Sequence, residues 1–154
     1  MSDSEESLLE AFRAYYEDLY KEVPHDADAL KELLDPWIPP VTDTKGLGKV
    51  VTIDELNLAI SQTAAKKSPG IDGVSNTAYK LMGPNAKISL LNAINGVLRD
   101  GEMDDEWKKG LIVLLFKKGE KTEPSNYRPI TLLNGDYKLL CKILANRLII
   151  QKLH

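Results

Sequence analysis

The feature that most constrains the fold is a pair of short apolar runs near the C-terminal end, separated by a polar loop. The first run, Leu111 to Phe116, has the length and composition of a strand. A loop rich in Lys, Glu, Gly, Pro and Ser follows, and a second short apolar run ends near Leu133. The pattern predicts one antiparallel hairpin. Pro129 cannot donate to a strand ladder, so the second run should lie at an edge or begin its pairing after that residue.

Four cations flank the open end of this hairpin: Lys117, Lys118, Lys121 and Arg128. Lysine presents a point charge and arginine a planar fork, and both bind phosphate oxygens. Exposed lysines also keep edge strands from pairing with other chains. The residues alone therefore fit either a phosphate-binding site or a solvated turn.

Apolar residues at helical spacing predict an α+β, mostly helical fold for the chain as a whole. The expected helices cover residues 4–21, 26–34, 52–65, 75–82, 86–99 and 136–153. Thr52 and Glu55 form a capping-box pattern at the start of the third helix. The Leu, Phe and Tyr stripe of residues 8–20 is more typical of packing than of base stacking. In the last helix, Asn134 or Asp136 is the expected cap.

The last helix also carries side chains with expected orientations. We expect an inward face formed by Tyr137, Leu140, Cys141, Leu144, Leu148 and their neighbours, with Lys138, Lys142, Asn146 and Arg147 partly outward. Cys141 is the single cysteine, so no intrachain disulfide can form, and a structural thiol in a reducing compartment is expected. The two histidines, His25 and His154, form no ligand cluster with it, which argues against a zinc site.

Between two predicted helices lies the run KSPGIDG, residues 67–73. Its Pro-Gly and Asp-Gly pairs specify tight turns, and termination of a helix is a sufficient explanation for them. Alternatively, Gly70 and Gly73 let a nucleic-acid backbone approach exposed N–H groups beside Lys66 and Lys67. The run is not a P-loop, because no Gly-Lys-Ser/Thr follows at the required spacing.

An Asp-Asp pair stands at residues 104–105. Because Glu106 and Trp107 follow it, we interpret Asp104 and Asp105 as negative charge at a helix N-terminus rather than as metal ligands. Trp107 is expected to anchor this turn to the core.

Charge is distributed unevenly between the two parts of the chain. The net charge is −3 overall, but residues 1–65 carry five basic and fourteen acidic residues, whereas residues 66–154 carry fifteen basic and nine acidic ones. Such asymmetry is typical of a nucleic-acid-facing portion beside an acidic one, although scattered solvated faces would also produce it. No signal-peptide pattern or membrane-length apolar run is present, so we expect a soluble, intracellular protein, cytoplasmic or nuclear, without a membrane partner.

Several ordered motifs together resemble the reverse transcriptases of non-LTR (LINE-type) retrotransposons. The run KSPGIDG is followed by KKG at residues 117–119, NYRPITLLN at 126–134 and KILANRL at 142–148. The resemblance implies that residues 51–154 form the fingers, the N-terminal part of the polymerase domain, and that residues 1–50 are a helical or linker segment preceding it. The resemblance does not extend to the palm and thumb, the other two parts of the family's polymerase domain.

The resemblance also implies functional residues. Arg128 matches the arginine that contacts the triphosphate of the incoming dNTP, with Lys117 preferred over Lys118 as its partner. The expected contacts with the RNA template and DNA primer come from Lys66, Lys67, Gly70, Gly73, Lys138, Lys142 and Arg147.

No catalytic or metal-binding residue is expected in this chain, because the family's metal-binding aspartates lie in the palm. Mg²⁺ is therefore expected only for the full polymerase, and the chain alone should be inactive. Two alternatives stay open: a residual or domesticated nucleic-acid-binding protein without chemistry, and a protein–protein interaction module. Self-association through the surface that would face the palm is a further expectation.

Overall fold

The computed structural model describes residues 3–24, 26–35 and 47–151, and these residues divide into two compact units. Unit 1 comprises Met1–Val41 and Leu114–Pro129, and unit 2 comprises Thr42–Val113 and Ile130–His154. The described part is mostly helical with one two-stranded antiparallel sheet, which confirms the predicted α+β class. Within it, none of the helices combines the length and apolar character that crossing a bilayer requires.

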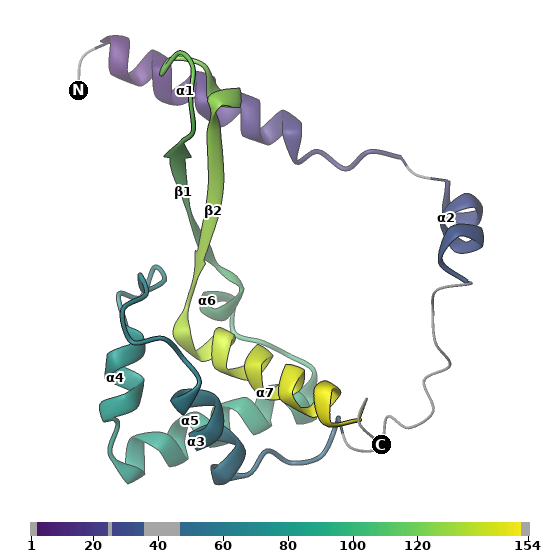
Figure 1. Ribbon diagram of the computed structural model, residues 1–154, viewed down its shortest axis with the longest axis vertical. Coiled ribbons are helices and arrows are strands. Elements are labelled where there is room, and N and C mark those ends of the chain that lie inside the picture. Colours follow the sequence, from purple (N-terminus) through teal and green to yellow (C-terminus); the bar gives the residue numbers. More distant parts are fainter. Residues whose placement is uncertain (1–2, 25, 36–46, 152–154) are drawn as a thin grey trace. The chain divides into compact units, whose positions relative to one another are not determined.

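The predicted hairpin is confirmed (Figure 1). Strand β1 is Gly110–Phe116, strand β2 is Tyr127–Leu133, and the 3₁₀ turn η1, Pro124–Asn126, lies in the loop between them. The division between the units crosses both strands, so the loop end belongs to unit 1 and the opposite end to unit 2. Pro129 is accommodated because the sheet has only these two strands, and each of them is an edge.

Unit 1 also contains helix α1, Asp3–Leu19, and helix α2, Ala27–Leu34. The second begins at Asp26, whose carboxylate accepts from the N–H groups of Asp28 and Ala29. Helix α1 packs against η1. The predicted apolar stripe of α1 is only partly buried in this unit: Phe12 and Tyr16 are half-buried, whereas Leu9, Leu19 and Tyr20 are exposed.

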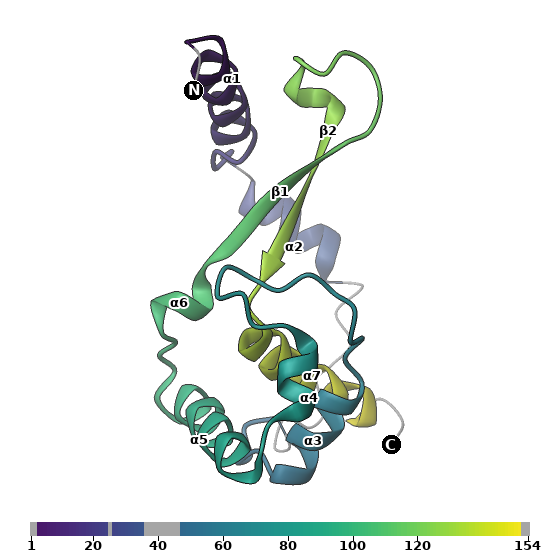
Figure 2. The same cartoon turned by 90° about the vertical axis from the view of Figure 1, so that its left-hand side faces the viewer.

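Unit 2 is a cluster of helices. Its elements are α3 (Ile53–Ser61), α4 (Asn76–Leu81), α5 (Pro84–Asp100), the short α6 (Asp105–Lys108) and α7 (Gly135–Gln151). Helix α3 contacts α4, α5 and α7, and α6 contacts α7, as Figure 2 allows the reader to follow. The capping box at Thr52 is confirmed, because Thr52 Oγ1 accepts from the Glu55 N–H while the Glu55 carboxylate accepts from the Thr52 N–H.

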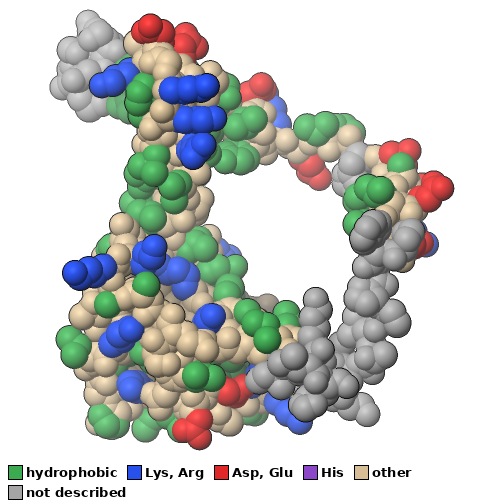
Figure 3. Space-filling model, in the orientation of Figure 1, with side chains coloured by type: hydrophobic (Ala, Val, Ile, Leu, Met, Phe, Trp, Pro, Cys, Tyr) green, Lys and Arg blue, Asp and Glu red, His purple; other side chains and the backbone are tan. Residues whose placement is uncertain are grey.

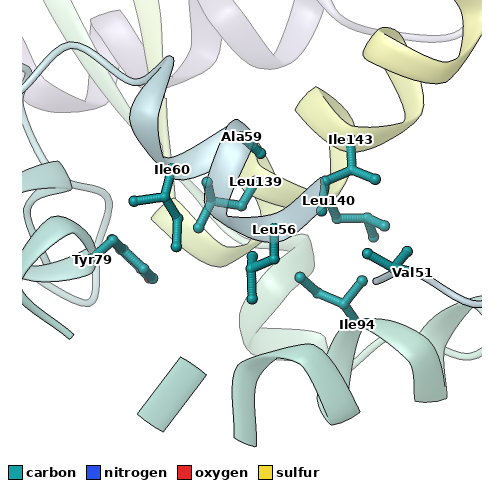
Figure 4. Close-up of a cluster of buried hydrophobic side chains, with 9 residues drawn as sticks. All are labelled: Val51, Leu56, Ala59, Ile60, Tyr79, Ile94, Leu139, Leu140 and Ile143. Carbon is teal, nitrogen blue, oxygen red and sulfur yellow. The ribbon is translucent and has the colours of Figure 1, made fainter. Parts of the chain in front are cut away.

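The core of unit 2 lies around α3, between α4, α5 and α7 (Figure 4). Its buried side chains are Val51, Leu56, Ala59, Ile60, Tyr79, Ile94, Leu139, Leu140 and Ile143. Trp107 packs against this cluster, as expected, and Asp104 accepts from the Glu106 N–H at the start of α6, which confirms its capping role. In α5, Ile94 is buried, whereas Ile88 is exposed.

The expected inward face of α7 is only partly correct. Leu140 is buried and Leu144 packs against the core, as expected, whereas Cys141 and Leu148 are exposed. Leu139, Ile143 and Arg147 are buried as well. Apolar residues occur on all sides of this helix, so their periodicity does not select a face. The buried face also contains Arg147, which forms the ion pair described below. Asn134, one of the two expected caps of α7, bonds the first turn of this helix through its backbone oxygen, which accepts from the Lys138 N–H.

Candidate nucleic-acid interface

The loop between α3 and α4 is shaped by its turn residues. Gly73 has φ of 71°, a left-handed conformation that favours glycine. Its N–H donates to the Gly70 carbonyl at 3.2 Å, and the Asp72 carboxylate accepts from the Val74 N–H at 2.9 Å. These bonds turn the chain and leave the side chains of Lys66 and Lys67 exposed.

Gly70 is placed differently from the expectation that it exposes backbone to a ligand. It is buried, and a Cβ added to it would lie 2.2 Å from Asn134 Oδ1 and 2.6 Å from the Asn134 backbone nitrogen. Glycine is therefore needed here for close packing of the loop against the end of β2. The next residue along from Asn134, Gly135, is similarly constrained, because a Cβ there would lie 2.2 Å from the ring of Tyr79.

These contacts bring two of the predicted site lysines to one pocket in unit 2. Its volume is about 320 Å³, and it is lined by Lys67, Ser68, Asn76, Thr131, Leu132, Leu133 and Lys138. Two ammonium groups beside hydroxyl and amide side chains suit a phosphate and sugar backbone. Lys142 follows Lys138 by four residues on α7, which places both on one side of that helix. Figure 3 shows several Lys and Arg side chains on the face of unit 2 turned toward the reader.

Arg147 lies outside this basic surface, because its guanidinium is buried. Its Nε donates to Glu55 Oε1 at 2.6 Å and its Nη2 to Glu55 Oε2 at 2.9 Å. Its Nη1 donates to the carbonyls of Leu47 and Lys49, both at 2.7 Å. The bonds from Arg147 hold the pKa of Glu55 at about 2, well below its usual range. The expected outward orientation of Arg147 is thus wrong, and its donors serve the fold.

The other predicted cations lie on the hairpin loop in unit 1. Lys117, Lys118 and Arg128 are all exposed, and within the described part of the chain their side chains form no ion pair. The Lys117 N–H donates to the Asn126 carbonyl at 2.9 Å, which closes the loop at its first residue. Lys121 lies over the Phe116 ring, 5.9 Å from its centroid. Figure 3 shows basic side chains gathered in this part of unit 1.

Aromatic packing supports the hairpin loop. The ring of Tyr127 meets those of Phe12 and Phe116 edge-on, with centroids 4.9 Å and 5.3 Å away. The Tyr16 hydroxyl donates to the carbonyls of Pro124 and Tyr127, each at 3.4 Å. Partial burial raises the pKa of Tyr16. The aromatic residues of α1 therefore pack on the loop that carries Arg128, in agreement with a packing role.

A second pocket of unit 2 is acidic and was not predicted from the sequence. Its volume is about 620 Å³, and its lining includes Asp72, Glu102, Asp104, Glu106 and Asp136 beside Trp107. Burial raises the pKa of Asp136, and the neighbouring Asp72 carboxylate adds to this effect. Such a pocket repels phosphate. Neither these carboxylates nor any other group of three or more His, Cys, Asp and Glu side chains in the described part of the chain is arranged to hold a metal ion.

The chain is similar in sequence to proteins encoded by transposons. It is 38% identical over 101 residues to a probable RNA-directed DNA polymerase from transposon BS of Drosophila melanogaster, which covers 65% of this chain. It is 32% identical over 100 residues, or 64% of this chain, to the RNA-directed DNA polymerase from mobile element jockey of the same species. Over 145 residues, or 93% of this chain, it is 29% identical to an uncharacterized 149 kDa protein of transposon TX1 from Xenopus laevis.

The matched regions are small parts of these relatives. The chain spans 11% of the length of each of the three. No family model matches the chain. The named relatives nevertheless confirm the sequence relationship to retrotransposon RNA-directed DNA polymerases that the motifs indicated.

Proposed function

We propose that this chain is the fingers part of a LINE-type reverse transcriptase and that its basic face in unit 2 contacts the template–primer backbone. The observation that carries the proposal is the pocket that joins Lys67 to Lys138, two residues 71 positions apart in the sequence. Lys67 begins the KSPGIDG motif of the resemblance, and Lys138 lies between the NYRPITLLN and KILANRL motifs. The relationship to RNA-directed DNA polymerases supports the same assignment.

Each lysine is assigned a backbone contact rather than a base contact. An ammonium group on a flexible stem binds phosphate as a point charge, and the pocket contains no aromatic side chain on which a base could stack. Lys66 precedes Lys67 in the loop and Lys142 lies one turn beyond Lys138 on α7, so we assign both to backbone contacts as well. Binding should therefore depend little on sequence and steeply on salt.

The test measures binding of the 154-residue chain to a fluorescein-labelled single-stranded RNA of mixed sequence at several salt concentrations. For single strands each phosphate contact contributes about 0.7 to the slope of log affinity against log salt. Lys67→Ala and Lys138→Ala should each reduce the slope by about that amount, which corresponds to about a fivefold loss of affinity at 0.1 M salt.

Lys108→Ala is the matched control. It removes the same charge from unit 2, but Lys108 pairs with Asp105 at 3.0 Å in acidic surroundings. We expect its slope to equal that of the wild type. Equal slopes for all four proteins would contradict the proposed interface.

We also propose that the hairpin loop contacts the triphosphate of the incoming dNTP through Arg128, with Lys117 or Lys118 as its partner. Their exposed, unpaired charges support the assignment. In a titration of the chain with dATP followed by NMR, Arg128→Ala should weaken binding, whereas Arg99→Ala, which removes an exposed arginine of α5, should not. Indistinguishable titrations would contradict the assignment.

We expect no nucleotide incorporation by this chain alone. The resemblance assigns the Mg²⁺-binding aspartates to the palm, whose motifs are not in this sequence. A primer-extension assay with Mg²⁺ tests this expectation, and incorporation above a no-protein control would contradict it.

A further inference from the structure

Asn134 lies at a buried junction that the sequence motifs did not reveal. Its side chain is among the few buried polar ones, with the residue only 3% exposed. A buried amide is costly unless its polar atoms are bonded, so its partners indicate why it is there. Those partners belong to two segments distant in the sequence.

The first partner segment is the loop that carries Lys66 and Lys67. Asn134 Oδ1 accepts from the Asp72 N–H at 3.4 Å, and the missing Cβ of Gly70 leaves room for the same oxygen. The second is α6, where Asn134 Nδ2 donates to the Glu106 carbonyl at 3.1 Å. One side chain thus connects both segments to the end of β2.

The backbone of Asn134 completes the arrangement. Its carbonyl accepts from the Lys138 N–H at 3.2 Å in the first turn of α7. The same residue therefore contacts both the loop that carries Lys67 and the helix turn that carries Lys138. Both lysines line the basic pocket.

We infer that Asn134 is a positioning residue for the nucleic-acid interface: it holds Lys67 against Lys138 at the spacing that the backbone contact requires. The inference rests on the proposed function of the pocket. Asn134 itself touches no nucleic acid, because it is only 3% exposed and, with Asp72 and Glu106, lines the acidic pocket rather than the basic one.

Binding experiments with paired variants separate positioning from a general structural role. In the wild-type background Lys67→Ala should reduce the salt slope by about 0.7. In an Asn134→Ala background Lys67→Ala should have no further effect, because the loosened loop no longer presents the lysine. Asn134→Ala alone should lower RNA affinity about fivefold or more at 0.1 M salt. Asn92→Ala, at an exposed asparagine of α5, is the matched control and should change neither the RNA affinity nor the effect of Lys67→Ala on the salt slope.

Two further measurements keep the test decisive if Asn134→Ala folds poorly. Gly70→Ala disturbs the contact with Asn134 from the loop side. In that background too, Lys67→Ala should have no further effect on the salt slope. Amide hydrogen exchange at Asp72 should accelerate about tenfold in either variant relative to Asn92→Ala.

The outcomes separate the positioning role of Asn134 from the proposed nucleic-acid interface. If Lys67→Ala reduces the slope equally in both backgrounds, or if exchange at Asp72 is unchanged, the positioning inference is overturned while the proposed interface stands. If Lys67→Ala has no effect in either background, the proposed interface fails and the inference fails with it.

Discussion

Replacing Arg147 should destabilise unit 2 through loss of its bonds to Glu55 and to the segment before α3. The side chain of Arg147 is 10% exposed and that of Glu55 is 32% exposed. Arg147→Met keeps much of the apolar stem but removes every donor. It leaves the Glu55 carboxylate without its cation and the Leu47 and Lys49 carbonyls without their donor.

The size of this destabilisation follows from the pKa of Glu55. Its reduction from 4.5 to about 2 corresponds to about 3 kcal/mol. Loss of one partner of a buried ion pair costs about 3–5 kcal/mol, and the partial exposure of Glu55 favours the lower value. We therefore expect Arg147→Met to reduce the free energy of unfolding by about 3 kcal/mol at pH 7.

The effect should depend on pH in a defined direction. Because the pKa of Glu55 is lower in the folded chain than in the unfolded chain, its contribution is fully present above the unfolded pKa of 4.5 and is lost as the pH falls toward 2. The difference between wild type and Arg147→Met should therefore shrink over that interval.

Urea denaturation followed by circular dichroism at pH 7 and at about pH 2.5 measures both quantities. Arg99→Ala is the control, because Arg99 is 74% exposed and pairs only with Asp100 on the surface. It should change stability by no more than about 0.5 kcal/mol. A similarly small effect of Arg147→Met at pH 7, or an effect of constant size down to about pH 2.5, would refute the reasoning.

Other substitutions test particular contacts. Gly70→Ala should destabilise the chain by about 1–3 kcal/mol in urea denaturation, because its Cβ would overlap Asn134. Gly96→Ala should instead stabilise it by about 0.5–1 kcal/mol, since Gly96 lies inside α5 with no atom within 4 Å of the added Cβ; a loss of stability would contradict this. Tyr16→Phe should accelerate amide exchange in η1 by removing its hydroxyl donor, and unchanged exchange would refute that contact. Cys141, being exposed, should react with a thiol reagent in the native chain nearly as fast as in urea, and strong protection would restore the inward orientation first expected for it.

Local chemistry made most of the fold predictable. The capping box at Thr52, the Asp104 cap and the Pro-Gly and Asp-Gly turns all act within a few residues, so their effects can be read from neighbouring positions. The hairpin was predictable for the same reason, because both strands and their loop lie within one short stretch.

Long-range pairing explains what the sequence did not predict. Arg147 meets Glu55 across 92 residues, and Asn134 meets Asp72 across 62. No local pattern shows that either side chain is buried. Because apolar residues surround α7, its sequence does not show which face packs against the core. The boundary at residue 50, the dNTP contacts and self-association remain predictions, and sedimentation of the chain would test the last.

We propose that the loop at residues 66–73 and the first turns of α7 form a nucleic-acid interface. Photocrosslinking of the chain to RNA containing 4-thiouridine, followed by mass spectrometry of the crosslinked peptides, tests this most directly. We expect crosslinks in peptides containing Lys67 or Lys138, and we expect fewer of them in Asn134→Ala. Crosslinks confined to the acidic pocket around Trp107, or to α1, would contradict it.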